Sequence, residues 1–262
     1  MEIDPGIVLL LDRTAARIAA AREVAVLTGA GVSAASGVPT FRGMEGLWKR
    51  FRPEELATSQ AFARDPALVW EWYDWRRRVI ARCAPNAAHE VLARWSRRVP
   101  PCTVITQNVD GLHERAGLAD VVRLHGSIWE VSCWSRCSSA PARWRDETVP
   151  FPALPPPCPY CGGLLRPGVV WFGETLPADA LIRAEAAATS CDVFLTAGTS
   201  AIVHPAAGLV WTARAHGAFT IEINPTETEA SPEVDLAVRL PAEVAFAELD
   251  ARLRQGTRTA AP

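Results

Sequence analysis

Four of the seven cysteines form two close pairs, Cys133 with Cys137 and Cys158 with Cys161. The pairs lie about 20 residues apart, a spacing at which four thiolates can surround one tetrahedral zinc ion. Such a site has no open coordination position, so we expect the zinc to be structural. The other interpretation is that these are unrelated core cysteines. It is disfavoured because the run from Cys158 to Gly163 has the composition of a turn.

A glycine-rich turn, Gly29–Gly31, directly follows the apolar run Val24–Thr28. Glycines at the end of a buried strand let the backbone approach a pyrophosphate, as in the first turn of dinucleotide-binding folds. Ala34 replaces the third glycine of the G-x-G-x-x-G pattern, so this motif alone leaves a ligand-free tight turn open as an alternative. The loop that follows adds an aromatic side chain and a cation, Phe41 and Arg42, beside the expected pyrophosphate.

Amide, carboxylate and imidazole groups are expected at the ends of two further strands. Asn108 and Asp110 follow the run Cys102–Thr106, and His125 follows Val121–Leu124. Open α/β sheets bind ligands at the carboxyl ends of their strands, and these groups suit a carboxamide and ribose hydroxyls. A lone histidine is often a hydrogen-bonded structural residue, but the convergence of three strand ends favours His125 as a general base.

The elements that must position these groups alternate between short β-branched runs and amphipathic helical patterns. This indicates an α/β fold with a Rossmann-type, doubly wound parallel sheet. The predicted strands are Val24–Thr28, Cys102–Thr106, Val121–Leu124, Val193–Ala197 and Phe219–Ile223. The predicted helices are Thr14–Arg22, Asn86–Arg97, Ala178–Thr189, Pro205–His216 and Ala242–Arg254. Two insertions, residues 43–83 and 127–171, interrupt the alternation and predict a smaller helical and zinc-binding module.

Composition excludes several classes of function. The net charge is −2, whereas nucleic-acid-binding proteins usually carry a basic excess, so no nucleic-acid partner is expected. No stretch approaches the roughly 20 apolar residues of a membrane span, and Glu2 and Asp4 stand where a signal peptide needs positive charge. A cytoplasmic protein with no membrane partner is predicted. In that reducing compartment Cys83, Cys102 and Cys191 are expected to be small buried hydrophobes.

Together these motifs resemble those of the sirtuins, a family of NAD-dependent protein-lysine deacylases. The matching segments span residues 25–241 and are Gly29–Ser33, Ser36–Arg42, Thr106–His113, Leu124–Gly126, the cysteine pairs, Val169–Glu174, Gly198–Ser200 and Asn224–Glu227. The resemblance implies one catalytic domain over residues 1–262. Its large lobe would comprise residues 1–42, 84–126 and 172–262, and its small lobe the two insertions.

The resemblance also implies that NAD is consumed as a co-substrate. Asn108 and Asp110 would hold the nicotinamide carboxamide, and Phe41 would shield the reactive ribose from water. The acyl oxygen of the lysine substrate would displace nicotinamide, after which His125 accepts a proton from a ribose hydroxyl that takes up the acyl group. The products would be free lysine, nicotinamide and O-acyl-ADP-ribose. The implied dinucleotide contacts are Gly29, Ala30, Gly31, Ser33, Phe41, Arg42, Trp48, Gln107, Asn108, Asp110, Gly198, Thr199, Ser200, Asn224 and Thr226.

Tyr73 and Arg76 are three residues apart in a predicted helix and therefore share one face. A phenol beside a guanidinium can bind a carboxylate, although packing and surface roles are the alternative. The pair resembles the sirtuin subclass that removes succinyl, malonyl and glutaryl groups, which implies that desuccinylation exceeds deacetylation. The resemblance further implies that the substrate, an acyl-lysine protein or peptide, pairs as a strand with Val170, Phe172, Gly173 and Glu174.

Other functions stay open at this point. An NAD oxidoreductase is supported by the Rossmann pattern but opposed by the incomplete glycine pattern and the Phe41–Arg42 loop. A zinc-ribbon binding module with a vestigial nucleotide site is opposed by the neutral charge and the polar strand ends. Within the family, the alternative is a deacetylase without acidic-acyl preference. Gly168 stands where this subclass often has histidine, an adenine contact is expected near Ala237, and we expect a monomer.

Overall fold

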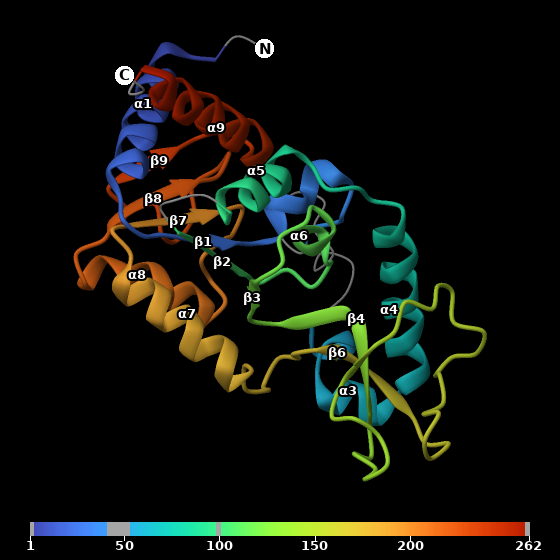
Figure 1. Cartoon of the computed structure of the whole chain (residues 1–262). Coiled ribbons are helices and arrows are strands. Elements are labelled where there is room, and N and C mark those ends of the chain that lie inside the picture. The colour runs from blue at the N-terminus through green and yellow to red at the C-terminus, as the bar shows by residue number, and fades with distance from the viewer. Residues whose placement is uncertain (1–2, 41–52, 98–100, 260–262) are drawn as a thin grey trace.

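The computed structural model describes residues 3–40, 53–97 and 101–259 (Figure 1). Its largest element is a six-stranded parallel sheet with the strand order β3-β2-β1-β7-β8-β9. The strands are β1 (Val24–Thr28), β2 (Cys102–Thr106), β3 (Val121–Arg123), β7 (Val193–Ala197), β8 (Phe219–Ile223) and β9 (Leu236–Val238). Every residue of β1 and β7 is buried, as expected for apolar strands covered on both faces.

Helices cover both faces of this sheet, with α7 and α8 on one face and α1, α5 and α9 on the other (Figure 1). The bounds of these helices and of the short helix α6 are α1 (Pro5–Ala20), α5 (Ala87–Trp95), α6 (Leu112–Arg115), α7 (Ala178–Ser190), α8 (Leu209–Ala215) and α9 (Ala242–Thr259). The doubly wound α/β fold predicted from the sequence is therefore confirmed. Among the described residues, none of the helices combines the length and the apolar character needed to cross a membrane.

Predicted and observed helix bounds differ by one or two residues in α5 and α7, and by more in three other helices. Helix α1 begins nine residues before the predicted Thr14, because Asp4 caps it by accepting the N–H of Gly6 and because Pro5 suits a first turn. The predicted helix Pro205–His216 is divided, with a 3₁₀ turn at Ala206–Gly208 before α8. Helix α9 continues beyond the predicted end at Arg254 to Thr259. Terminal turns carry little periodic signal, which explains these differences.

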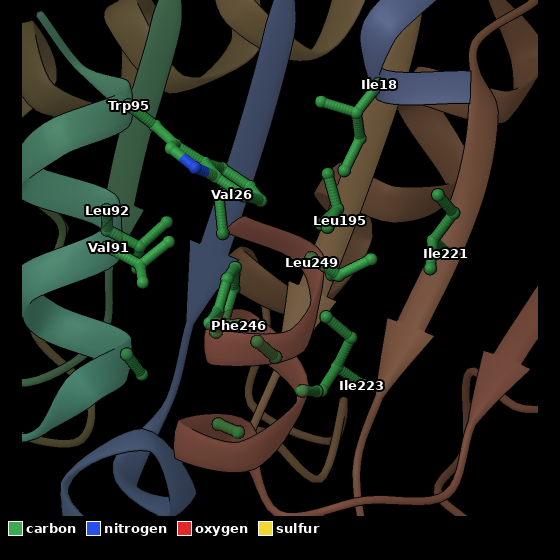
Figure 2. Packing of buried hydrophobic residues seen from close by; sticks show 14 of the residues in the cluster. Ile18, Val26, Val91, Leu92, Trp95, Leu195, Ile221, Ile223, Phe246 and Leu249 are labelled. Atoms are coloured by element: carbon green, nitrogen blue, oxygen red, sulfur yellow. The ribbon is translucent and has the colours of Figure 1, made fainter. Parts of the chain in front are cut away.

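The core between the sheet and α9 is apolar and close-packed. Figure 2 shows Phe246 and Leu249 of α9 directed at the sheet, where they meet Val26 of β1 and Leu195 of β7. The ring of Trp95 from α5 packs edge-on against Phe246, with the centroids 5.6 Å apart. This packing fixes the strands, and so it fixes the positions at which their carboxyl ends emerge.

A second, three-stranded sheet with the order β5-β4-β6 lies within the region predicted to form the small lobe. Its strands are β4 (Gly126–Cys133), β5 (Trp144–Arg145) and β6 (Leu165–Val169), and the nearby helices are α2 (Pro53–Leu56), α3 (Ser59–Arg64) and α4 (Pro66–Ala81). Gly168 of β6 lies so close to β4 that a Cβ there would approach the Glu130 Cβ to 2.6 Å, so histidine would not fit at this position.

Candidate functional site

A cleft of about 1230 Å³ opens at the carboxyl ends of the large-sheet strands and extends to α4 and residues 169–174. It lies beside the point where the strand order reverses, between β1 and β7, which is where open α/β sheets bind ligands. Most of the predicted site residues line it, namely Gly29, Ala30, Gly31, Tyr73, Arg76, Gln107, Asn108, His125, Val170, Phe172, Gly173, Glu174, Gly198, Thr199, Ser200, Asn224 and Thr226.

Not every predicted dinucleotide-binding residue can be placed at the cleft. Phe41, Arg42 and Trp48 lie outside the described residues. Ser33 and Asp110 are buried behind the wall of the cleft. The sequence places both in motifs that border the cleft, but it does not reveal which side chains turn inward.

Ser33 and Asp110 support Asn108 from behind. The Ser33 hydroxyl donates to the Asp110 carboxylate at 2.8 Å, and the Asn108 amide donates to Ser33 Oγ at 3.2 Å and to the Gly29 carbonyl at 3.0 Å. Burial raises the pKa of Asp110, while the Leu112 N–H that its carboxylate accepts acts in the opposite direction. These bonds use both amide hydrogens of Asn108, so its side-chain oxygen is the group left to accept a bond from a ligand.

The glycine turn is braced against the neighbouring strand. Gly29 N–H donates to the Ala197 carbonyl at 2.9 Å, and Gly31 N–H donates to the Gly198 carbonyl at 2.8 Å. A Cβ on Gly31 would lie 2.8 Å from the Gly198 Cα, and Gly198 itself has a φ of +59°. These glycines are therefore needed for two turns to interlock. The chain continues as a 3₁₀ helix, Ala30–Ser36, rather than as the long helix of a dinucleotide turn.

His125 is held in one protonation pattern by its surroundings. Its Nδ1 lies 3.0 Å from the Gln107 carbonyl, and because a carbonyl only accepts, Nδ1 must carry the hydrogen in this bond. Burial lowers the pKa of His125, and the Gln107 carbonyl partly opposes that shift. At neutral pH the imidazole is therefore neutral with a free Nε2, which is the form that accepts a proton.

The end of the cleft beside Thr199 and Asn224 is ordered by side-chain hydrogen bonds to one loop. Asn224 donates to the Thr199 carbonyl at 3.0 Å, and Gln107 donates to the Thr199 hydroxyl at 2.9 Å. Ala237 lies within β9 and does not line the cleft. The lining at this end instead includes Glu227, Thr228, Glu229, Pro241, Ala242 and Glu243, most of which had no role in the sequence-based prediction.

The opposite end of the cleft is lined by the predicted acyl-binding pair. Tyr73 is 2 % exposed and Arg76 is 7 % exposed, and both project from α4. Burial raises the pKa of Tyr73, against the neighbouring Arg76 cation, and burial lowers the pKa of Arg76. Two unpredicted tryptophans complete this end: Trp72 lies under the Arg76 guanidinium at 4.8 Å, and Trp171 donates to the Tyr73 oxygen at 2.9 Å.

The predicted peptide-pairing segment, residues 170–174, is not a regular strand. The strand β6 ends at Val169, and Phe172 makes only an isolated bridge, in which its N–H donates to the Ala57 carbonyl at 2.9 Å. Glu174 forms an ion pair with Arg166 at 2.6 Å, so its carboxylate is already engaged. The segment thus borders the cleft through its backbone and through the exposed Phe172.

The four paired cysteines come together as predicted. Their Sγ atoms all lie within 4.8 Å of one another, and those of Cys133 and Cys161 are 3.7 Å apart. A tetrahedral zinc ion with Zn–S bonds of about 2.3 Å separates its sulfurs by about 3.8 Å, so the cluster fits a zinc ion. None of the four lines the cleft, which agrees with a structural role. Cys83 and Cys191 are buried, and Cys102 is half-buried.

Comparison with known proteins gives consistent matches. The model of the Sir2 family matches residues 29–205. The NAD-dependent protein deacylase of Aquifex aeolicus is 50% identical over 233 residues, covering 89% of this chain and 96% of the relative. The solved structure of a mutant Sir2 homologue with ADP ribose superposes with a TM-score of 0.90 at 46% identity, covering 95% of this chain and 99% of the other.

Two further solved structures differ in what they bind. The complex of a Sir2 homologue with NAD has a TM-score of 0.86 at 47% identity, and the match covers 94% of both chains. A more distant Sir2 structure, bound to a myristoylated histone peptide, has a TM-score of 0.77 at 28% identity and covers 95% of this chain and 98% of the other.

Proposed function

This chain belongs to the Sir2 family, and we propose that it is an NAD-dependent protein-lysine deacylase that removes succinyl and malonyl groups in preference to acetyl. The general activity is that of its relatives, which are NAD-dependent protein deacylases. NAD is the co-substrate, and zinc fits the four-cysteine site as a structural ion. The acyl preference is our own inference, and it depends mainly on the buried Tyr73–Arg76 pair.

The residues around the cleft suit the chemistry of deacylation. NAD supplies the ribose that accepts the acyl group. Asn108 presents its amide oxygen to the nicotinamide carboxamide, and the neutral imidazole of His125 accepts a ribose proton at Nε2. Thr199, Ser200 and Asn224 hold the adenosine half. These roles predict that nicotinamide is released without reduction of NAD, which separates the enzyme from a dehydrogenase.

The acyl preference follows from the charge and burial at the far end of the cleft. Arg76 is nearly buried, and burial lowers its pKa because the buried positive charge is poorly solvated. A substrate carboxylate that reaches Arg76 compensates for this buried positive charge. The phenol of Tyr73 adds a second hydrogen-bond donor. A hydrogen bond to a charged group contributes about 1.5–3 kcal/mol, which corresponds to roughly a ten- to hundredfold effect on efficiency.

The test compares kcat/KM for succinyl-lysine and acetyl-lysine versions of the same peptide. We expect the wild-type enzyme to prefer the succinyl peptide, and Arg76→Met to lose about ten- to hundredfold on that peptide with a much smaller change on the acetyl peptide. Arg82→Met is the matched control, because Arg82 lies exposed at the end of the same helix and does not line the cleft.

A third peptide, carrying a myristoyl group, extends the comparison because a related structure holds such a peptide. A higher efficiency on the myristoyl or acetyl peptide than on the succinyl peptide would refute the acidic-acyl preference. An unchanged ratio in Arg76→Met would also refute it. Neither outcome affects the assignment of the chain as an NAD-dependent deacylase.

A further inference from the structure

We propose that Trp171 is a positioning residue for acyl recognition, which makes the Tyr73 hydroxyl a hydrogen-bond donor toward the terminal carboxylate of the acyl group. The proposal rests on the acidic-acyl preference proposed above and extends it to a residue outside the Tyr73–Arg76 pair. Its basis is the direction of a single hydrogen bond and the contacts that hold the donor in place.

The bond joins Trp171 Nε1 to Tyr73 Oη at 2.9 Å, and both side chains are 2 % exposed. An indole N–H can only donate, so the phenol oxygen must be the acceptor. A phenol also carries one hydrogen of its own, and that hydrogen cannot point back at the indole. Within residues 3–40, 53–97 and 101–259, no group accepts a hydrogen bond from Tyr73. The hydrogen is therefore available to the cleft that Tyr73 lines.

Trp171 is fixed on two sides. The Arg166 guanidinium lies 3.8 Å from the centre of its ring, and Arg166 binds both oxygens of Glu174, at 2.6 and 2.9 Å. Glu174 in turn accepts the backbone N–H of Trp171 at 2.9 Å, and Phe62 packs against the indole with the centroids 5.3 Å apart. The indole therefore has little freedom to turn away from Tyr73.

This arrangement lets both Tyr73 and Arg76 offer hydrogen-bond donors at the far end of the cleft. Tyr73 contributes a donor hydrogen, and Arg76, which stands one helical turn later, contributes only donors. A carboxylate accepts from both, whereas the methyl group of an acetyl chain can accept from neither. When phenylalanine replaces Trp171, the Tyr73 hydroxyl can rotate toward the phenyl ring or toward water. The enzyme then loses part of its advantage for an acidic acyl chain.

A double-mutant cycle tests whether Trp171 acts through the Tyr73 hydroxyl. The variants are Trp171→Phe, Tyr73→Phe and the double variant, and the readout is the ratio of kcat/KM for succinyl and acetyl peptides. We expect Tyr73→Phe to lower that ratio about tenfold and Trp171→Phe to lower it about threefold to tenfold. In the Tyr73→Phe background the Trp171→Phe substitution should have no further effect, since its target hydroxyl is gone.

The matched control is Trp70→Phe. Trp70 is a fully buried tryptophan on the same helix as Tyr73. Its replacement also removes an indole N–H bond, the one to the Leu165 carbonyl at 2.7 Å. Trp70 does not line the cleft. The Trp70→Phe substitution should lower the free energy of unfolding without changing the succinyl-to-acetyl ratio of kcat/KM. This control separates an effect on specificity from a general loss of packing.

A second measurement does not depend on turnover. The chain has only two tyrosines, Tyr73 and Tyr160, so a sample labelled with ¹³C at tyrosine Cζ gives two resonances, and Tyr160→Phe assigns them. The Tyr73 resonance should shift in Trp171→Phe but not in Trp70→Phe. If Trp171→Phe does not fold, Arg166→Lys, which weakens the support of the indole, should lower the acyl ratio only when Tyr73 is present.

The proposal is overturned if the effects of Trp171→Phe and Tyr73→Phe multiply in the double variant, or if the Tyr73 resonance does not move. A wild-type enzyme with no succinyl preference, together with an Arg76→Met variant of unchanged ratio, would instead refute the proposed function. In that case the Tyr73 resonance still reports whether the indole holds the hydroxyl.

Discussion

Lowering the pH from 7.5 to 5 should destabilise the protein, because two histidines are buried in their neutral form. His113 lies behind the cleft with Nε2 2.9 Å from Thr28 Oγ1, and its ring centroid is 4.9 Å from that of His89. Burial lowers the pKa of His89 to about 4. Burial, with the neighbouring His89, lowers the pKa of His113 to about 3. The unfolded chain takes up these protons near pH 6.5, whereas the folded protein does not.

The size of the effect follows from these values. A histidine whose pKa is lower in the folded state costs the protein no stability above pH 6.5. The protein loses stability progressively as the pH falls from 6.5 toward the pKa of the folded state. Between pH 7.5 and 5 each histidine costs about 2 kcal/mol, so the pair costs about 4 kcal/mol. Asp110 acts in the opposite direction, because burial raises its pKa and its protonation then favours the folded state. His125, whose pKa burial also lowers, adds to the loss. About 4 kcal/mol is therefore the contribution of this pair alone.

Urea denaturation at a series of pH values between 5 and 7.5 measures this dependence. His113→Asn should reduce the change in unfolding free energy by about 2 kcal/mol, because one titrating group is removed. The exposed His216, replaced by asparagine in the same way, is the control and should leave the dependence unchanged. A wild-type stability that does not fall toward pH 5, or a His113→Asn variant with the wild-type dependence, would show that the reasoning is wrong.

Two further predictions concern the base and the metal. His125→Ala should lower the rate at which deacylated peptide and O-acyl-ADP-ribose form from an acyl peptide at least about a hundredfold. The wild-type rate of deacylation should fall in acid as His125, whose pKa burial holds below its usual value, takes up a proton. Full deacylation activity of the variant would place the base elsewhere. The purified chain should contain one zinc ion by elemental mass spectrometry. The Cys158→Ser variant should lose this zinc ion together with thermal stability. An unchanged melting temperature in a zinc-free protein would contradict a structural role.

The strands and the residues at their ends could be predicted from the sequence because their signals are local. The runs Val24–Thr28, Cys102–Thr106, Val193–Ala197 and Phe219–Ile223 are the observed strands to the residue. A buried parallel strand needs a continuous apolar run, and its end is marked by the first polar or glycine residue. The resemblance to sirtuins, which those strand-end motifs carried, is confirmed by the family match.

Features that depend on tertiary packing could not be predicted in this way. Nothing in the sequence near Ser33 or Asp110 indicates that both side chains turn away from the cleft, because that depends on the His89, Asn108 and Ser33 side chains that surround them. Trp171 lies in the segment Val170–Glu174 that was expected to pair with the substrate peptide, but no role was predicted for its side chain. The role that we propose for it depends on a bond to Tyr73, which lies 98 residues earlier in the chain.

The cleft takes its two ends from different parts of the chain. The end that we propose for the dinucleotide is built by turns at the ends of the large-sheet strands, and the proposed acyl end is built by α4 and Trp171. On this proposal, inherited changes in α4 would alter which modification is removed while dependence on NAD is retained. After gene duplication, copies that have diverged in this helix would act on different targets, yet all would respond together to the NAD supply of the cell.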